Sequence, residues 1–157
     1  MTGGGRPFAG EIRPGNYARV RRSWQPGDTV RLVLPMAVRR VACHPYVAEN
    51  AGRVALFRGP LLYCLEGADQ PGVDLRDIVL FAEATPRAEF RPDLLGGVVV
   101  LQMPAEVIPP AEGWQGRLYR PSGPTAEVAG RPLTATAIPY YAWANRDPGP
   151  MQVWLAQ

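Results

Sequence analysis

The chain has 157 residues, of which 46% are hydrophobic, 17 are glycine and 18 are proline. Because proline costs an interior helical position about 3 kcal/mol and glycine about 1 kcal/mol, this frequency excludes helix bundles, coiled coils and helical repeats. The net charge of +3 results from 17 arginines against 14 acidic residues. The chain has no lysine, which excludes Schiff-base chemistry and a P-loop lysine.

The positive charge lies in the first part of the chain, since ten arginines against three acidic residues give residues 1–58 a charge of +7. No helix-turn-helix, zinc-finger or RNA-recognition pattern accompanies it, so we expect no nucleic-acid partner. We interpret this excess of positive charge as arginines that alternate along the solvent-exposed faces of strands. The sequence also lacks an apolar stretch of about 20 residues, so we expect no membrane span.

The first elements predicted are the two strands of a hairpin. Tyr17–Trp24 and Thr29–Leu34 each alternate polar and apolar residues, and Gln25–Asp28 between them has the composition of a turn. Residues 1–15 are interpreted as a flexible leader or the remnant of a preceding domain. They contain no apolar segment of a signal peptide, which favours a cytoplasmic location and leaves a secreted parent protein open.

Further short strands follow, separated by turn residues. The stretch from Arg53 to Glu66 is either a strand pair or one strand broken at Gly59-Pro60, where proline removes a ladder donor. Asp74–Phe81 fits a strand or a single helical turn, and Pro104–Gly116 a long loop. The other predicted strands are Val38–Cys43, Ala88–Leu94, Gly97–Met103, Gly116–Tyr119, Thr125–Val128, Leu133–Pro139 and Met151–Ala156.

About ten short strands with frequent turns and little helix predict an all-β fold, namely an antiparallel β-sandwich of the jelly-roll kind. Residues 16–157 are expected to form this single domain, and residues 16–35 a hairpin that could derive from a preceding sandwich. The apolar runs Leu61–Leu65 and Val98–Leu101, together with Tyr141 and Trp143, are expected to supply the core.

Few residues could carry chemistry. Cys43, His44 and Cys64 offer three metal ligands, but neighbours on a strand point to opposite faces, so we expect no metal site and no cofactor. A Cys64–His44 nucleophile pair requires the fold to join them, whereas a thiol inside an apolar strand is usually buried and inert. Acidic residues are interpreted as solvated edges and caps. Those that could pair are Glu49, Glu66, Asp77, Glu106 and Asp147.

Aromatic residues gather near the C-terminus and beside the long loop. Aromatic faces near an amide suit a sugar-binding surface, whereas in a sandwich they mostly pack in the core or an interface. Strand alternation would send Tyr141 and Trp143 to the same face. The candidate carbohydrate-binding residues are Trp114, Tyr119, Tyr140, Tyr141, Trp143 and Asn145.

Three stretches carry a family resemblance: Gly15–Pro35, Glu49–Glu66 and Leu133–Leu155. The second contains the motif RVALFRGPLLYCLE at Arg53–Glu66, and the third the motif IPYYAWANR at Ile138–Arg146. Together they resemble the C-terminal part of glycoside hydrolase family 127, the β-L-arabinofuranosidase family. The resemblance runs from Gly15 to Leu155.

The resemblance implies a parent enzyme with an (α/α)₆ catalytic barrel followed by β-sandwich domains. The family's acids and zinc-bound cysteine nucleophile lie in that barrel, so no catalytic role is implied for Cys43 or Cys64. The chain looks like a detached tail of such an enzyme. We expect a non-catalytic accessory domain that braces the barrel or forms a subunit contact, with the barrel, and in some assemblies a second copy, as its partner. The alternative is a carbohydrate-binding module for plant-type, arabinose-containing glycans.

Overall fold

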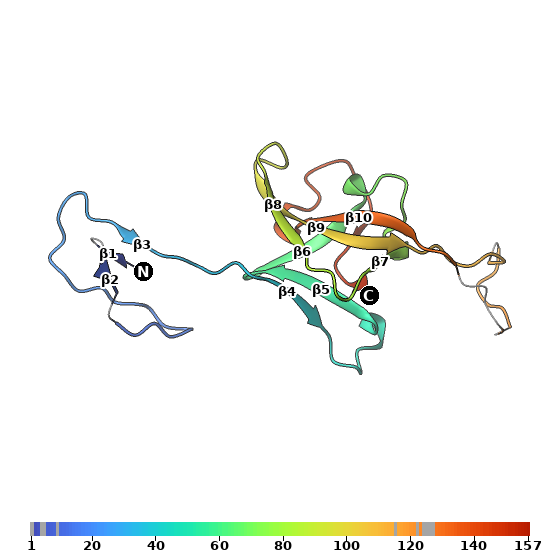
Figure 1. Cartoon of the computed structure of the whole chain (residues 1–157), viewed down its shortest axis with the longest axis horizontal. Coiled ribbons are helices and arrows are strands. Elements are labelled where there is room, and N and C mark those ends of the chain that lie inside the picture. The colour runs from blue at the N-terminus through green and yellow to red at the C-terminus, as the bar shows by residue number, and fades with distance from the viewer. Residues whose placement is uncertain (1, 4–5, 9, 115, 122, 124–127) are drawn as a thin grey trace. The chain divides into compact units, whose positions relative to one another are not determined.

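The computed structural model describes residues 1–157 apart from 1, 4–5, 9, 115, 122 and 124–127. The chain divides into two compact units, Met1–Pro35 and Met36–Gln157 (Figure 1). Residues 16–35, predicted as a hairpin that could derive from a preceding sandwich, lie in the first of these units. Among the described residues, no helix has the length and apolarity that a membrane span requires.

The first unit contains three two-residue strands, β1 (Thr2–Gly3), β2 (Arg6–Pro7) and β3 (Val30–Arg31), and β1 pairs with both others. The turn predicted at residues 25–28 forms, since the Asp28 amide donates to the Gln25 carbonyl at 3.0 Å. The predicted strand pairing is wrong, because β3 pairs with β1 and no strand forms over residues 17–24. None of the described side chains from 10 to 35 is buried, so no core fixes the hairpin register.

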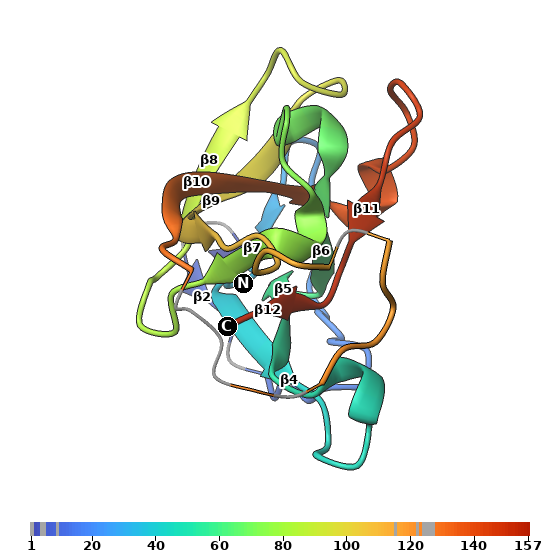
Figure 2. The ribbon, with the colours of Figure 1, turned by 90° about the vertical axis from the view of Figure 1, so that its right-hand side faces the viewer.

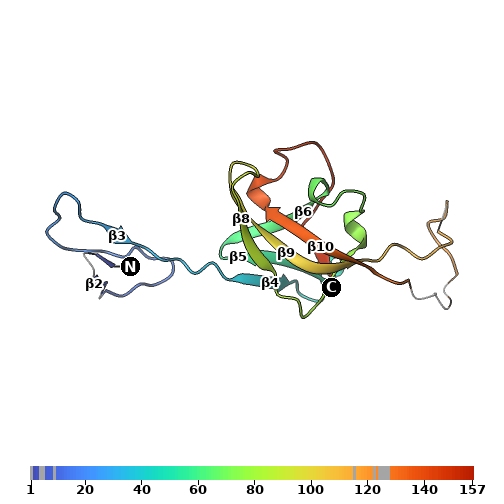
Figure 3. The same ribbon diagram turned by 45° about the horizontal axis from the view of Figure 1, so that its top comes forward.

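The second unit is built on a closed ring of strands. Its order is β6–β10–β9–β7–β12–β5, and the β5–β6 pair closes it (Figure 2). The strand β4 extends the sheet from β5, β11 lies against β6, and β8 lies outside beside β9 (Figure 3). The strands are β4 (Val38–Ala42), β5 (Arg53–Arg58), β6 (Leu61–Glu66), β7 (Ile78–Leu80), β8 (Arg87–Arg91), β9 (Val98–Val107), β10 (Arg131–Pro139), β11 (Met151–Gln152) and β12 (Leu155–Ala156).

The all-β prediction is confirmed, while the wholly antiparallel sandwich is corrected to a six-stranded barrel. The reason lies at the C-terminus, where Val153-Trp154 interrupts the single strand expected at Met151–Ala156. The chain therefore leaves β6 and inserts β12 between β5 and β7, parallel to β7, which closes the ring. The helices of the described residues are single 3₁₀ turns, η1 (Ala48–Asn50), η2 (Gly67–Asp69), η3 (Leu75–Asp77) and η4 (Tyr140–Ala142).

In the second unit, some of the predicted strands and turns are present and others are not. The Arg53–Glu66 stretch is a strand pair that turns at Gly59-Pro60, with Gly59 at φ +57°. Residues 74–81 hold both expected forms, η3 followed by β7. Residues 116–119 are not a strand, and the Arg117 amide instead closes a turn onto the Trp114 carbonyl at 2.9 Å. The predicted strand at 125–128 lies outside the described residues, apart from Val128.

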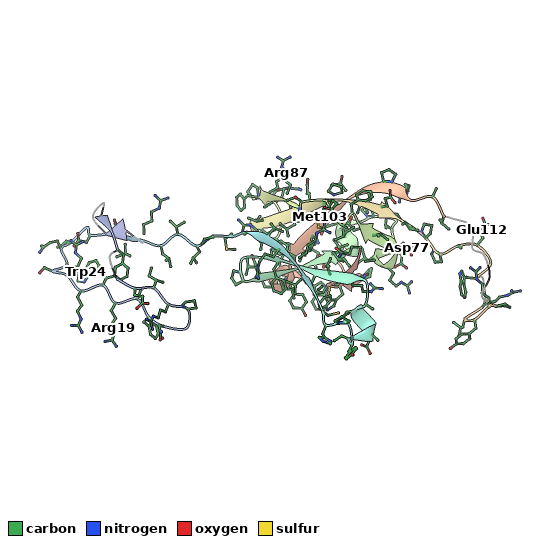
Figure 4. All side chains as sticks on the ribbon, turned by 60° about the horizontal axis from the view of Figure 1, so that its bottom comes forward. Arg19, Trp24, Asp77, Arg87, Met103 and Glu112 are labelled. Atoms are coloured by element: carbon green, nitrogen blue, oxygen red, sulfur yellow. The ribbon has the colours of Figure 1, made fainter. Side chains whose placement is uncertain are left out.

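Every strand of the ring contributes to one apolar interior, into which Met103 of β9 points (Figure 4). Alternation along β9 and β10 sends one set of side chains inward, as expected of a barrel with a filled interior. The core predicted around residues 61–65 and 98–101 is confirmed in its inward positions. The buried interior residues are Val54, Leu56, Tyr63, Leu65, Leu75, Ile78, Leu80, Leu101, Met103, Ala105, Ala135, Ala137 and Leu155.

Candidate functional site

A second buried cluster lies on the outer face of β6. Tyr63 and Leu65 of this strand point into the barrel, so Cys64 and Glu66 point outward. Cys64 packs with Val98, Val100, Ile138 and Ala142. The chain after β10 covers this face, and the Gly67 amide fixes it by donating to the Pro150 carbonyl at 2.8 Å. Both faces of β6 are therefore buried, and Glu66 is a carboxylate with 1% exposure.

Arg146 neutralises the buried Glu66 carboxylate. Its Nε donates to Glu66 Oε2 at 2.9 Å, and its Nη2 contacts the same oxygen. The other oxygen, Oε1, accepts from the Ala144 amide at 3.3 Å. A carboxylate in an apolar cluster carries a large desolvation cost unless such partners are present. Glu66 therefore ties the loop containing Arg146 to the end of β6.

Arg146 also binds Asp69, which lies in η2 directly after β6. Its Nη1 is 2.8 Å from Asp69 Oδ1 and its Nη2 is 2.6 Å from Oδ2, a bidentate geometry. Hydrogen bonding to Asp69 and Glu66 raises the pKa of Arg146 against the opposing effect of burial, so the guanidinium stays charged. We call the set Glu66, Asp69 and Arg146 the arginine clamp.

The clamp holds an unusual backbone. Ala144 has φ +62°, a left-handed conformation that non-glycine residues seldom adopt. The Asn145 side-chain amide donates to the carbonyls of Ala142 and Trp143 at 3.1 and 3.2 Å and supports the same turn. The side-chain amide of Asn145, which was a candidate for sugar binding, thus stabilises the turn of its own loop.

The sequence analysis did not find the clamp, because it weighed Glu66 only as a possible partner of other carboxylates. The available signal was a glutamate ending the otherwise apolar strand LLYCLE, which requires a buried cationic partner. Its partner Arg146 is 80 residues away along the chain, a distance that local patterns do not span.

The aromatic residues of η4 are on the surface. Tyr140, Tyr141 and Trp143 are 41%, 64% and 37% exposed, so the expectation that Tyr141 and Trp143 fill the core is wrong. Because the segment forms a 3₁₀ turn with three residues per turn, Tyr140 and not Tyr141 shares a face with Trp143. These two rings stack with centroids 5.9 Å apart.

The six candidate sugar-binding residues divide between two places in the fold. Trp114 and Tyr119 lie on the connection from β9 to β10, where the Arg120 guanidinium sits 4.4 Å from the Trp114 ring centroid. The other four lie on η4 and the loop after it. There, Tyr141 and Asn145 help to line a surface pocket of about 440 Å³. Sugar binding by these residues stays a prediction, because their contacts fit a packing role equally well.

The residues weighed for metal or nucleophile chemistry, Cys43, His44 and Cys64, have contacts with other residues. Cys43 donates to the Asn50 carbonyl at 3.5 Å, and the His44 ring contacts Tyr46 with centroids 5.0 Å apart. Cys64 has no exposure, and its burial, with Glu66 and Asp69 nearby, raises its pKa to about 12. The part of the chain that the structure describes contains no group of three metal-ligating side chains.

Alkylation should separate the two thiols. At pH 8 we expect iodoacetamide to modify the half-buried Cys43 and to leave Cys64 unmodified until the chain is unfolded by urea, since the thiolate is the reactive form. Because folding raises the Cys64 pKa from 9.0 to about 12, its contribution to stability is intact below about pH 9 and is lost as the pH rises toward 12. Mass spectrometry of the alkylated peptides checks the first point. Rapid labelling of Cys64 in the native chain would contradict it.

The comparisons with known proteins agree with this architecture. Residues 38–156, which contain the barrel and all three residues of the arginine clamp, match the family model of the glycoside hydrolase family 127 C-terminal domain. The chain belongs to glycoside hydrolase family 127. The resemblance drawn from its sequence motifs is thereby confirmed, and the clamp joins the last residues of the two motifs, Glu66 and Arg146.

Relatives in family 127 are much longer than this chain. A non-reducing end β-L-arabinofuranosidase from Bifidobacterium longum subsp. longum is 38% identical over 160 residues, which cover 98% of this chain and 23% of that protein. A crystal structure of a family 127 β-L-arabinofuranosidase from Geobacillus stearothermophilus T6 is 47% identical, with a TM-score of 0.69 over 87% of this chain and 21% of its own. A second solved glycoside hydrolase is 34% identical, with a TM-score of 0.77 over 99% of this chain and 25% of its own.

Proposed function

We propose that this chain is a non-catalytic accessory domain of a family 127 glycoside hydrolase, with a role in structural support or in a subunit contact. Two relatives that it matches are β-L-arabinofuranosidases, and it spans about a quarter of their length. The matched region is the one that the family model describes as C-terminal. Its partner would be the catalytic part of such an enzyme, or a second copy of the domain.

The observation that carries the proposal is that Glu66 and Cys64 are buried and have no access to a substrate. Glu66 is buried, and both its carboxylate oxygens are occupied, one by Arg146 and the other by the Ala144 amide. Cys64 is buried beside it with a pKa of about 12 and is not a thiolate at neutral pH. A general acid or nucleophile needs access to substrate and a matched pKa. These groups instead support a scaffold.

The experiment is a hydrolysis assay on the chain alone, with an aryl β-L-arabinofuranoside as substrate. We expect release of the aryl group no faster than in buffer, for the wild-type chain and for Cys64→Ser alike. Turnover by the wild-type chain that Cys64→Ser or Glu66→Gln abolishes would overturn the proposal. Circular dichroism of each variant ensures that folded proteins are compared.

A further inference from the structure

The segment between β10 and β11, residues 140–150, lies on the outside of the barrel and leads into β11 in Figure 2. The structure describes all of it, and Ala142 is its only buried residue. None of its residues belongs to the barrel interior, so the ring of strands does not need this segment for its apolar core. The segment instead covers Cys64 and Glu66 on the outer face of β6.

Two anchors hold this segment to the end of β6. The first is the arginine clamp, which the Ala144 amide joins by donating to Glu66 at 3.3 Å. The second is the Gly67 amide, which donates to the Pro150 carbonyl at 2.8 Å. Because the single guanidinium of Arg146 holds both acidic residues of the clamp, the clamp is released in one step and not one contact at a time.

The backbone of the segment is strained at Ala144. Its φ of +62° lies in a left-handed region that non-glycine residues occupy only when the surrounding structure holds them there. Release of the clamp relieves this strain and returns the Glu66 carboxylate to water, and both changes favour opening. Exposure of the apolar side chains of Val98, Val100 and Ile138 opposes it. The balance is therefore set at the outer face of the sheet and not in the barrel interior.

We infer that residues 140–150 form a strap that opens as one unit while the six-stranded barrel stays closed. Segments with few buried apolar contacts and an exposed backbone open at a lower free energy than core strands. The open form is a minor state, so Cys64 becomes accessible in only a small fraction of molecules and brief alkylation leaves it unmodified. Opening of the strap does not depend on the proposed accessory role.

Opening of the strap removes the aromatic surface of η4. The stacked rings of Tyr140 and Trp143 lie on the strap, and Tyr141 and Asn145 help to line the pocket of about 440 Å³. A ligand or domain that contacts this surface binds the closed form and shifts the equilibrium toward it. The arginine clamp thereby couples every contact made through η4 to the state of the strap.

Amide hydrogen exchange of the whole chain, measured by nuclear magnetic resonance below the urea unfolding transition, tests the strap. The reporters are the amides of Gly67 and Ala144, which donate to the two anchors. We expect their protection factors to agree within twofold and to lie at least a hundredfold below that of the Ala137 amide, which is in the barrel between β6 and β9. Their exchange should depend weakly on urea, because opening of the strap exposes little surface, whereas exchange at Ala137 should rise steeply.

A substitution in the barrel interior separates the two kinds of opening. Leu101→Ala should accelerate exchange of the Ala137 amide at least tenfold, because Leu101 belongs to the interior. Exchange at Gly67 and Ala144 should stay within twofold of wild type, because the strap and its anchors are intact. If Leu101→Ala does not fold, the milder Ile78→Val replaces it, with an expected acceleration of at least threefold at Ala137 alone.

A substitution in the clamp tests what holds the strap. Arg146→Gln should accelerate exchange at Gly67 and Ala144 at least tenfold. The matched control is Arg91→Gln, which removes an exposed ion pair outside the strap and should leave both rates within twofold of wild type.

Three outcomes would overturn the inference. Equal protection and equal urea dependence at Gly67, Ala144 and Ala137 would show that the segment opens only when the whole domain unfolds. Protection factors that differ between Gly67 and Ala144 would show that the two ends of the segment open separately. Unchanged exchange in a folded Arg146→Gln variant would show that the clamp does not hold the strap closed.

Discussion

Replacing Arg146 with alanine is expected to lower the free energy of unfolding by about 3 kcal/mol, the lower end of the range for breaking a buried ion pair. The substitution leaves the Glu66 carboxylate without its cationic partner at a site with 1% exposure. Arg146 itself keeps 21% of its side chain exposed, so solvent reduces the loss from the upper end of that range. Urea unfolding followed by circular dichroism measures the effect.

The matched control for Arg146→Ala is Arg91→Ala. Arg91 pairs with Asp93 at 2.9 Å, but their side chains are 39% and 65% exposed, and solvent screening leaves such a pair little effect on stability. Adding Glu66→Gln to Arg146→Ala should restore part of the stability, because it removes the unpaired charge. Equal effects of Arg146→Ala and Arg91→Ala would show that the arginine clamp does not hold the loop.

The second large effect is expected from Leu101→Ala, which should cost about 2–5 kcal/mol. Leu101 lies in the middle of the barrel interior with no exposure, on β9, which pairs with β10, β7 and β8. The cavity left by alanine cannot collapse easily where six strands close around it. Because a domain of this size is stable by only about 5–15 kcal/mol, a large part of the folded state would be lost.

Thermal and urea unfolding of Leu101→Ala should be compared with Leu118→Ala. Leu118 is the same residue type at 87% exposure, and its substitution should change stability by less than about 0.5 kcal/mol. If the free energy of unfolding of Leu101→Ala lies within about 1 kcal/mol of the wild-type value, Leu101 does not belong to a tightly packed barrel core.

Local patterns were sufficient for β5 and β6, which pack on the filled core. They were not sufficient for the end of β9, since residues 104–107 belong to that strand although they were predicted as the start of a loop. The Arg53–Glu66 pair was predicted within one or two residues, because alternation and the Gly59-Pro60 turn agree with the packing there. The same reasoning failed at residues 17–24, where alternation is present but none of the described side chains of residues 10–35 is buried to select a register. Alternation alone does not make a strand without a surface to pack against.

Barrel closure and the clamp depend on contacts between distant residues. The strand β12 has only two residues, so its sequence could not indicate that it would lie between β5 and β7. The aromatic cluster was misread because a period of two was applied to a 3₁₀ turn, which has a period of three. In both cases tertiary contacts decided the local structure.

The most direct test of the accessory role is a complementation assay. It uses the Bifidobacterium longum relative, truncated by removal of the region that this chain matches. Hydrolysis of an aryl β-L-arabinofuranoside is measured for the truncated enzyme alone, with the wild-type chain, and with Cys64→Ser. If this chain is an accessory domain without catalytic groups, the wild-type chain and Cys64→Ser will change the rate equally. Restoration of activity by the wild-type chain and not by a folded Cys64→Ser variant would contradict the account.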